Sequence, residues 1–324
     1  MVSWIKKTLP CCVQEKRGTM AFLHLLESIR NPVLDALFQL ITLFGEETLF
    51  ILVGLLFFWC IDKKEGFFLL CVGLMGTVIN QALKLFFRIP RPWVRDPSFS
   101  IVESAREAAT GYSFPSGHTQ TSVGVYGGIA RWTGKSMLSG VCIALCVLVP
   151  LSRMYLGVHT PADVGVSILV ALALIFVIYP LMRRNCSNAK VMRPLFAVMT
   201  LMALSFMAFV HLYSFPADVD TDNLAHGVKN AYTMLGCILG VWLAWETDRK
   251  SLQFETKAPL AVQAVKLLVG LGILLGIKAG LKAPLYALTG GHHIADAIRY
   301  FLMVAFAGCI WPMTFPFLTK KLSK

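Results

Sequence analysis

Long apolar runs separated by short polar segments are the dominant pattern of this chain. A membrane-spanning helix needs about 20 mostly apolar residues, so runs of this length predict helices that cross a bilayer. The clear candidates are residues 47–61, 66–87, 117–132, 136–152, 161–182, 194–214, 225–245, 260–281 and 295–318. The pattern therefore predicts an all-α fold, a polytopic helical bundle in a membrane.

The segment before these runs, residues 31–45, fits two interpretations. Apolar residues recur in it at helical spacing, whereas Asp35 and Gln39 lie on another side of the same helix. Such a segment is either a short first span or a helix that lies in the membrane interface. We favour the span, which gives ten spans in total with the nine runs above.

The composition agrees with a membrane protein. Of the 324 residues, 56% are hydrophobic and only 15% are charged, whereas soluble domains average about 25% charged residues. The net charge of +12 does not indicate nucleic-acid binding, because the basic residues lie in short loops between apolar runs. The nine cysteines show no spacing typical of zinc ligands, and most fall inside apolar runs as small buried hydrophobes.

The charges of the loops predict the orientation in the membrane. The basic loops are residues 63–64, 131–135, 183–193, 249–257 and 320–324. By the positive-inside rule these loops are cytoplasmic, together with an N-terminal segment, residues 1–30, if residues 31–45 cross the membrane. Residues 84–118 and 153–163 then face the extracytoplasmic side, periplasmic or lumenal. The compact loops favour a bacterial inner membrane over the endoplasmic reticulum.

The first polar motif is Lys84, at the end of the span 66–87, with Arg91-Pro92 just after that span. Pro90 and Pro92 stop that helix, so Arg91 lies in a turn just outside the membrane. Cations at a helix end commonly extend toward the interface without any ligand, and this simpler interpretation applies to both residues.

The second motif, Pro115-Ser116-Gly117-His118, opens the span 117–132. A helix N-terminus presents free N–H groups to an anion, Ser116 can cap it, and Gly117 allows close approach of a ligand. An ordinary N-cap is the alternative for Ser116 and Gly117. His118 lies beside this terminus at the membrane boundary.

The third motif contains Ser152-Arg153 and then His159, Thr160, Pro161 and Asp163. Pro161 suits the first turn of the next helix, and Thr160 suits its N-cap. Asp163 follows His159 by four residues, close enough to accept a hydrogen bond from the imidazole and make its other nitrogen a better nucleophile. The alternative is a carboxylate that only stabilises the first turn of the helix.

Together, Lys84-x6-Arg91-Pro92, Pro115-Ser116-Gly117-His118 and Ser152-Arg153-x5-His159-x3-Asp163 resemble the three-part signature of the type 2 phosphatidic acid phosphatase superfamily. The resemblance implies metal-independent hydrolysis of a lipid phosphate or diphosphate through a phosphohistidine intermediate, with no cofactor and no metal. It also implies a six-helix phosphatase core, residues 31–184, followed by about four additional spans. These spans form a C-terminal membrane extension, residues 194–318, before a cytoplasmic tail, residues 319–324.

The resemblance also implies a role for each residue of the signature. His159 is the expected nucleophile, Asp163 orients it, and His118 is the general acid and base. The expected phosphate ligands are Lys84, Arg91, Ser116, Gly117 and Arg153. In the extension, His292, His293 and Asp296 form a candidate metal site, although adjacent histidines on a loop are usually just solvated.

The expected partners are membrane lipids and a lipid phosphate substrate, and nucleic acid is excluded. Phosphatidate, phosphatidylglycerol phosphate, polyprenyl phosphate or diphosphate and sphingoid-base phosphate all fit. A non-catalytic lipid transporter or lipid-binding protein that retains the fold is the alternative, and a vanadate haloperoxidase is a third. Extra helices after the signature are also similar to sphingosine-phosphate phosphatases. The oligomeric state is open.

Overall fold

The computed structural model describes residues 11–322, and all the regular secondary structure in this range is helical, which confirms the all-α prediction for it. The longer helices are α2 (Cys11–Ser28), α3 (Pro32–Thr42), α4 (Glu47–Leu56), α5 (Lys63–Phe87), α7 (Gly117–Trp132), α8 (Ser136–Tyr155), α9 (Pro161–Asn185), α10 (Ala189–Leu212), α11 (Thr221–Thr247), α12 (Leu260–Gly280) and α14 (Ile294–Ala305). The shorter helices are α6 (Pro92–Arg95), α13 (Lys282–Leu288), α15 (Trp311–Met313) and α16 (Phe315–Leu322).

Within residues 11–322, six helical stretches are long and apolar enough to cross a membrane, and a bent pair makes a seventh candidate. The protein is therefore an integral membrane protein, but the ten predicted spans are not confirmed as a count. Helix α7 has only 16 residues and is largely enclosed by its neighbours, so it does not need a lipid-facing apolar surface. Helix α11 has 27 residues, but its first half carries polar residues such as Asn223 and Lys229.

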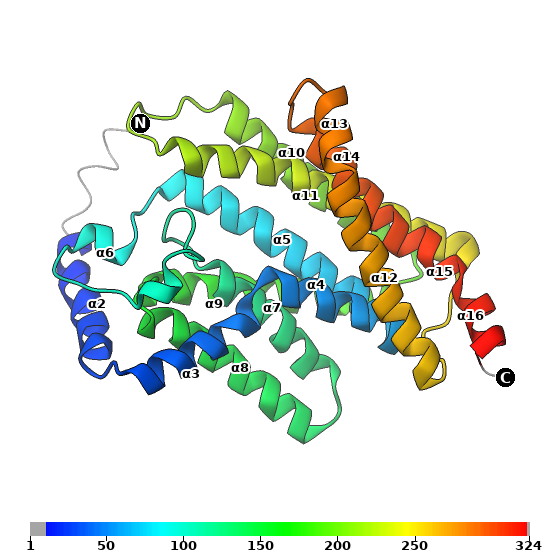
Figure 1. Ribbon diagram of the computed structural model, residues 1–324, viewed down its shortest axis with the longest axis horizontal. Coiled ribbons are helices and arrows are strands. Elements are labelled where there is room, and N and C mark those ends of the chain that lie inside the picture. Colours follow the sequence, from blue (N-terminus) through cyan, green and yellow to red (C-terminus); the bar gives the residue numbers. More distant parts are fainter. Residues whose placement is uncertain (1–10, 323–324) are drawn as a thin grey trace.

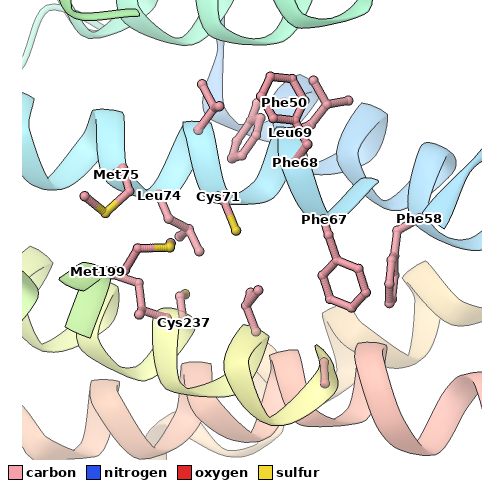
Figure 2. Packing of buried hydrophobic residues seen from close by; sticks show 14 of the residues in the cluster. Phe50, Phe58, Phe67, Phe68, Leu69, Cys71, Leu74, Met75, Met199 and Cys237 are labelled. Atoms are coloured by element: carbon pink, nitrogen blue, oxygen red, sulfur yellow. The ribbon is translucent and has the colours of Figure 1, made fainter. Parts of the chain in front are cut away.

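Helix α5 is the central element of the bundle. Helices α7 and α9 pack on one side of it, and α10 and α11 pack on the other (Figure 1). Leu74, Cys71 and Phe67 of α5 point toward α11, where Cys237 lies opposite them (Figure 2). The motif-bearing half and the C-terminal half of the chain therefore share one apolar core around α5.

Residues 32–45 form the first half of the bent helix pair. Asp35 of α3 accepts a hydrogen bond of 2.7 Å from the hydroxyl of Tyr155, and Thr42 accepts one of 2.7 Å from Arg153. Both partners lie in the last turn of α8, so α3 enters along the end of that helix. The chain then bends by 50° before α4, which continues to Ile61. This geometry fits one bent span better than a separate first span.

The N-terminal helix α2 lies at the end of the bundle where α8 finishes. Arg30, just beyond α2, donates hydrogen bonds to the carbonyl oxygens of Tyr155, at 3.0 Å, and Ser100, at 2.8 Å. Residues 18–30 thus share one end of the bundle with the loop after α5. The sequence predicts a cytoplasmic location for residues 18–30 and an extracytoplasmic location for residues 84–118. Because the two segments are in contact, these two predictions cannot both be correct. Residues 1–10 of the predicted segment lie outside the described residues.

The C-terminal helices approach α11 closely through small residues. A Cβ atom on Gly236 would lie 2.2 Å from the carbonyl oxygen of Ala297, and one on Gly240 would lie 2.7 Å from Val304. Glycines four residues apart on one face of a helix allow such close backbone contact in membranes. The contact holds α14 against α11 and so joins the extension to the core.

Candidate active site

Six of the eight predicted site residues line one cavity of about 200 Å³. They come from the end of α5, the loop after it, the start of α7, the end of α8 and the loop before α9. The six are Lys84, Arg91, Gly117, His118, Arg153 and His159. The other two, Ser116 and Asp163, lie behind the cavity wall. Segments that are far apart in the sequence therefore meet at one end of the bundle.

The end of α5 places Lys84 and Arg91. Arg88 adopts a left-handed conformation with φ of 50° and ends the helix, so Lys84 lies in its last turn. Arg91 donates hydrogen bonds to the carbonyl oxygens of Thr110, at 2.6 Å, and Val158, at 2.8 Å. Arg91 thereby fixes both loops that border the cavity. A solvated cation at a helix end, which is the simpler interpretation of the sequence, would not need these hydrogen bonds.

The start of α7 presents backbone N–H groups to the cavity. The hydroxyl of Ser116 caps the helix by accepting a hydrogen bond from the N–H of Thr119, and the Ser116 side chain is fully buried. A Cβ atom on Gly117 would have no heavy atom within 4 Å, so open space remains beside this residue for a ligand. Gly117 and His118 thus face the cavity, whereas the predicted contact of Ser116 with phosphate stays a prediction.

His159 lies between a cation and a carboxylate. Its Nε2 accepts a hydrogen bond of 3.0 Å from Arg91, and its Nδ1 lies 3.6 Å from Oδ2 of Asp163. The second distance is too long for a hydrogen bond. That Oδ2 atom instead accepts hydrogen bonds from the hydroxyl of Ser113, at 2.6 Å, and from the backbone N–H of Thr160, at 2.7 Å. Asp163 is therefore positioned beside His159 by two other groups.

The charge state of His159 suits a nucleophile. This residue lies in the loop between α8 and α9, where burial and then the nearby Arg91 guanidinium hold the pKa of its imidazole well below the usual 6.5. A neutral imidazole keeps a lone pair on one ring nitrogen. Because Nε2 accepts from Arg91, that lone pair lies on Nε2, the ring nitrogen remote from Asp163.

Arg153 is a buried cation with a free donor. Its side chain is only 1% exposed, and Nη1 donates to Thr42 at 2.7 Å. Its Nε atom has no hydrogen-bond partner among the residues that the structure describes. Buried donors are normally paired, so an unpaired guanidinium N–H beside a cavity indicates an anionic ligand.

Several residues around the cavity were not predicted from the sequence. Ser113 and Thr42 hold Asp163 and Arg153, and Glu47, Asn80 and Gln120 line the same cavity. The available signal was the presence of polar residues inside apolar runs, such as Asn80 within the span 66–87. Polar groups at such positions are expensive and usually functional.

The polar residues of the extension form a separate cluster. Asp296 accepts a hydrogen bond of 2.6 Å from Arg299 and lies 3.2 Å from Nδ1 of His293. Over residues 11–322, no three His, Cys, Asp or Glu side chains come together as metal ligands. Arg299 and Asp296 thus neutralise each other inside the extension.

Comparisons with known proteins extend this picture. Residues 65–186 match the PAP2 superfamily, and residues 232–323 match the family described as PAP2 superfamily phosphatase, transmembrane extension. The first match contains all eight predicted site residues. The second confirms the predicted C-terminal extension, whose exact boundaries stay predictions.

Individual relatives match about half to two thirds of this chain. A probable sphingosine-1-phosphate phosphatase of Dictyostelium discoideum is 32% identical over 161 residues, which cover 45% of this chain and 38% of the relative. Undecaprenyl-diphosphatase BcrC of Bacillus subtilis is 29% identical, with 47% of this chain and 77% of the relative covered. Human sphingosine-1-phosphate phosphatase 2 is 26% identical, with 66% and 53% covered. The chain thus spans only about two fifths to a half of the sphingosine-1-phosphate phosphatases that it matches.

Among solved structures, the crystal structure of Aquifex aeolicus LpxE is 26% identical to this chain. The match covers 50% of this chain and 94% of the LpxE chain, with a TM-score of 0.43.

Proposed function

Because the chain belongs to the PAP2 superfamily of phosphatases and carries its transmembrane extension, we propose that it hydrolyses a lipid phosphate or diphosphate through a phosphohistidine at His159. One observation carries the proposal: two imidazoles and three cations line a single cavity. His159 is the nucleophile, His118 is the general acid and base, and Lys84, Arg91 and Arg153 bind the phosphoryl oxygens.

The cations stabilise the charge that develops on the phosphoryl group. Phosphoryl transfer depends mainly on positioning and on fixed positive charges around the equatorial oxygens. Arg91 and Arg153 are held in place by Val158 and Thr42, so little reorganisation is needed when the substrate binds. The N–H of Gly117 and the start of α7 add a donor for the same oxygens.

In the first half-reaction, Nε2 of His159 attacks phosphorus in line with the ester oxygen. The N–P bond forms as the P–O bond to the lipid breaks, and His118 donates its proton to the leaving alkoxide. In the structure, Arg91 donates a hydrogen bond to Nε2. When the substrate binds, Arg91 must donate this hydrogen bond to a phosphoryl oxygen instead. The carboxylate of Asp163 lies near Nδ1 and stabilises the positive charge that forms on the imidazole.

In the second half-reaction, water hydrolyses the phosphohistidine. His118, now neutral, takes a proton from the water as its oxygen attacks phosphorus. The N–P bond breaks, the lone pair returns to Nε2, and inorganic phosphate leaves. His118 is again protonated, so the cycle needs no metal ion and no cofactor to balance.

The relatives suggest the range of substrates. Their names give sphingosine-1-phosphate, undecaprenyl diphosphate and phosphatidylglycerophosphate as substrates. All are phosphate esters or anhydrides with an apolar tail, which suits a polar cavity at one end of a membrane bundle. We also propose that this end faces the extracytoplasmic side, because the basic loops lie at the other end.

The test is phosphate release from a panel of lipid phosphates by the purified chain in detergent with EDTA. Wild type should release phosphate, His159→Ala should not, and His118→Ala should accumulate an acid-labile phosphoprotein when the substrate has a good leaving group. Tyr179→Phe, on the far part of α9, serves as the folding control. If neither wild type nor His159→Ala releases phosphate from any lipid, the chain is a lipid-binding or transport protein that retains the fold, whereas equal release by both would rule out His159 as the nucleophile.

A further inference from the structure

A second, apolar cavity of about 130 Å³ adjoins the site cavity. Both cavities share three lining residues, Glu47, Phe50 and Thr77. The apolar cavity lies between α4 and α5 of the core and α11, α12 and α14 of the extension. Figure 2 shows part of its wall, including Phe67 and Leu74 of α5 and Cys237 of α11. Helices of the extension therefore form about one side of the apolar cavity, and this cavity suits an alkyl chain.

Unpaired polar groups lie at the junction of the two cavities. Asn80 is 4% exposed and Gln120 is 5% exposed, and both line the site cavity. Neither amide atom of Asn80, nor Nε2 of Gln120, has a hydrogen-bond partner anywhere in residues 18–322. Buried amides are normally paired, so these groups indicate a ligand with hydroxyl or amino groups.

Glu47 is the only carboxylate that lines either cavity in the described chain, and it lines both. Its side chain forms no hydrogen bond and no ion pair within residues 18–322. Lys278 of α12 acts on it electrostatically but does not reach salt-bridge distance. The Glu47 side chain is exposed rather than enclosed, so its carboxylate is open to a ligand in either cavity. The group that pairs with a carboxylate is a cation.

The order of residues along α5 sets the distance from the proposed phosphate ligand Lys84 to the polar Asn80 and to the apolar Leu74. With a rise of 1.5 Å per residue, Asn80 lies about 6 Å deeper than Lys84, and Leu74 lies about 9 Å deeper than Asn80. A phosphate held by Lys84 thus places the next few atoms of a lipid beside Asn80 and Glu47. The remaining chain then continues to Leu74 in the apolar cavity.

We propose that Glu47, Asn80 and Gln120 form a subsite for an ammonium and hydroxyl group next to the phosphate ester. The preferred substrate is then a single-chain amino-alcohol phosphate, with its alkyl chain in the apolar cavity. This inference rests on the proposed function and narrows its substrate class. Diacyl and polyprenyl phosphates, which have no cation near the ester, leave Glu47 unpaired.

The test compares two substrates that differ only in the subsite ligand. One is dihydrosphingosine 1-phosphate, and the other is octadecyl phosphate, which has the same chain length but neither the amine nor the hydroxyl group. The measured quantity is the ratio of their kcat/KM values. We expect wild type to prefer the amino-alcohol phosphate about three- to fivefold, because an ion pair with the exposed Glu47 carboxylate is lost with the alkyl phosphate.

Two variants identify the source of the preference. Glu47→Gln keeps the shape of the side chain but removes its charge, and it should bring the ratio close to one. Glu65→Gln is the matched control, because Glu65 is a buried carboxylate at the opposite end of α5 that lines neither cavity. This control should keep the wild-type ratio within about twofold.

Binding to the His159→Ala chain tests the subsite without turnover. The Kd values of both lipid phosphates are measured in this background, with and without Glu47→Gln. A preference in binding that vanishes with Glu47→Gln supports the subsite even if no hydrolysis occurs, in which case only the proposed activity fails. Hydrolysis of both lipids at equal rates, or a preference that survives Glu47→Gln, overturns the subsite and leaves the phosphatase standing.

Discussion

Ser113 donates a hydrogen bond of 2.6 Å to Oδ2 of Asp163 from the loop before α7. The two residues are 50 positions apart, and both are buried. Together with the N–H of Thr160, this bond holds the carboxylate 3.6 Å from Nδ1 of His159. Ser113 is therefore a positioning residue for the proposed nucleophile and touches no substrate itself.

Replacing Ser113 with alanine should lower kcat about 10- to 100-fold, because hydrogen bonds to charged groups contribute about 1.5–3 kcal/mol. KM should change by less than about twofold, since the cations that bind phosphate stay in place. Steady-state kinetics on one lipid phosphate measure both quantities. Ser122→Ala is the matched control, because Ser122 is also buried and bonds only to the carbonyl oxygen of Thr119 in its own helix. Equal losses of kcat in the two variants would argue against a positioning role.

The sequence could predict that the three motifs lie close together in the structure, because each of them lies at a helix end. Pro161 and the N-cap Thr160 mark the start of α9. The structure confirms that cap, including the reciprocal hydrogen bond that the Asp163 carboxylate accepts from the N–H of Thr160. Ser116 likewise caps α7 as predicted. Capping residues and prolines act locally, so their positions can be recognised from a single sequence.

The supporting residues could not be predicted in the same way. Thr42 and Ser113 matter only because α3 and the 108–116 loop fold back onto α8 and α9. The location of α2 has the same cause, since it depends on contacts with residues 96–100. Such contacts join distant segments, and a local pattern of polar and apolar residues does not encode them.

A substitution at Gly236 tests whether α14 of the extension packs against α11 as closely as the structure indicates. A Cβ atom at this position would lie 2.2 Å from the backbone oxygen of Ala297, which cannot move without shifting α14. Gly236→Ala should therefore destabilise the protein by about 1–3 kcal/mol, as overpacking does. Thermal unfolding in detergent measures the effect as a lower Tm.

The control for Gly236 is Gly272→Ala in α12. A Cβ atom on Gly272 would have no heavy atom within 4 Å, so the Tm should stay the same or rise slightly. If both variants melt like wild type, α11 and α14 do not approach as closely as described.

The contact between α2 and the loop after α5 should depend on pH. His24 of α2 contacts Asp96 of the loop, with Nε2 3.2 Å from Oδ2. Hydrogen bonds to Asp96 and then to Glu27 raise the pKa of His24 above its usual 6.5. Hydrogen bonds from Ser98 and then from His24 lower the pKa of Asp96 below its usual 3.8.

The sign of each shift sets the pH window. The contribution of His24 is fully present below its unfolded pKa and is lost as pH rises through its raised pKa in the folded protein. The contribution of Asp96 is present above its unfolded pKa and is lost as pH falls through its lowered pKa. The contact should thus be strongest between about pH 4 and about pH 6.

Hydrogen exchange of the amides of residues 18–28, corrected for intrinsic rates, measures this effect. Protection should be modestly higher at pH 6 than at pH 8.5, because the pair is partly exposed and screened. His24→Gln should remove the difference between the two pH values. Protection that is equal at both pH values in wild type would show that the pair does not hold α2.

The arrangement of α2 makes a final prediction about topology. Residues 18–30 contact residues 96–100, so both segments must lie on the same side of the membrane as the site. The loop at residues 186–188, between α9 and α10, lies at the other end of α9. If the basic loops are cytoplasmic, as the positive-inside rule predicts, the segment 18–30 is extracytoplasmic despite Lys16 and Arg17 before it.

Single cysteines at Ser28, Ser98 and Ser187, in a background without the nine native cysteines, test this arrangement. A membrane-impermeant maleimide should label Ser28→Cys and Ser98→Cys in intact cells, and Ser187→Cys only after permeabilisation. The reverse pattern would keep the two site-side positions together but place the site in the cytoplasm, which would contradict the proposed orientation. Labelling of Ser28→Cys and Ser98→Cys from opposite sides would contradict the contact itself. Because Arg30 ties α2 directly to the end of α8 through the carbonyl oxygen of Tyr155, we expect the first pattern.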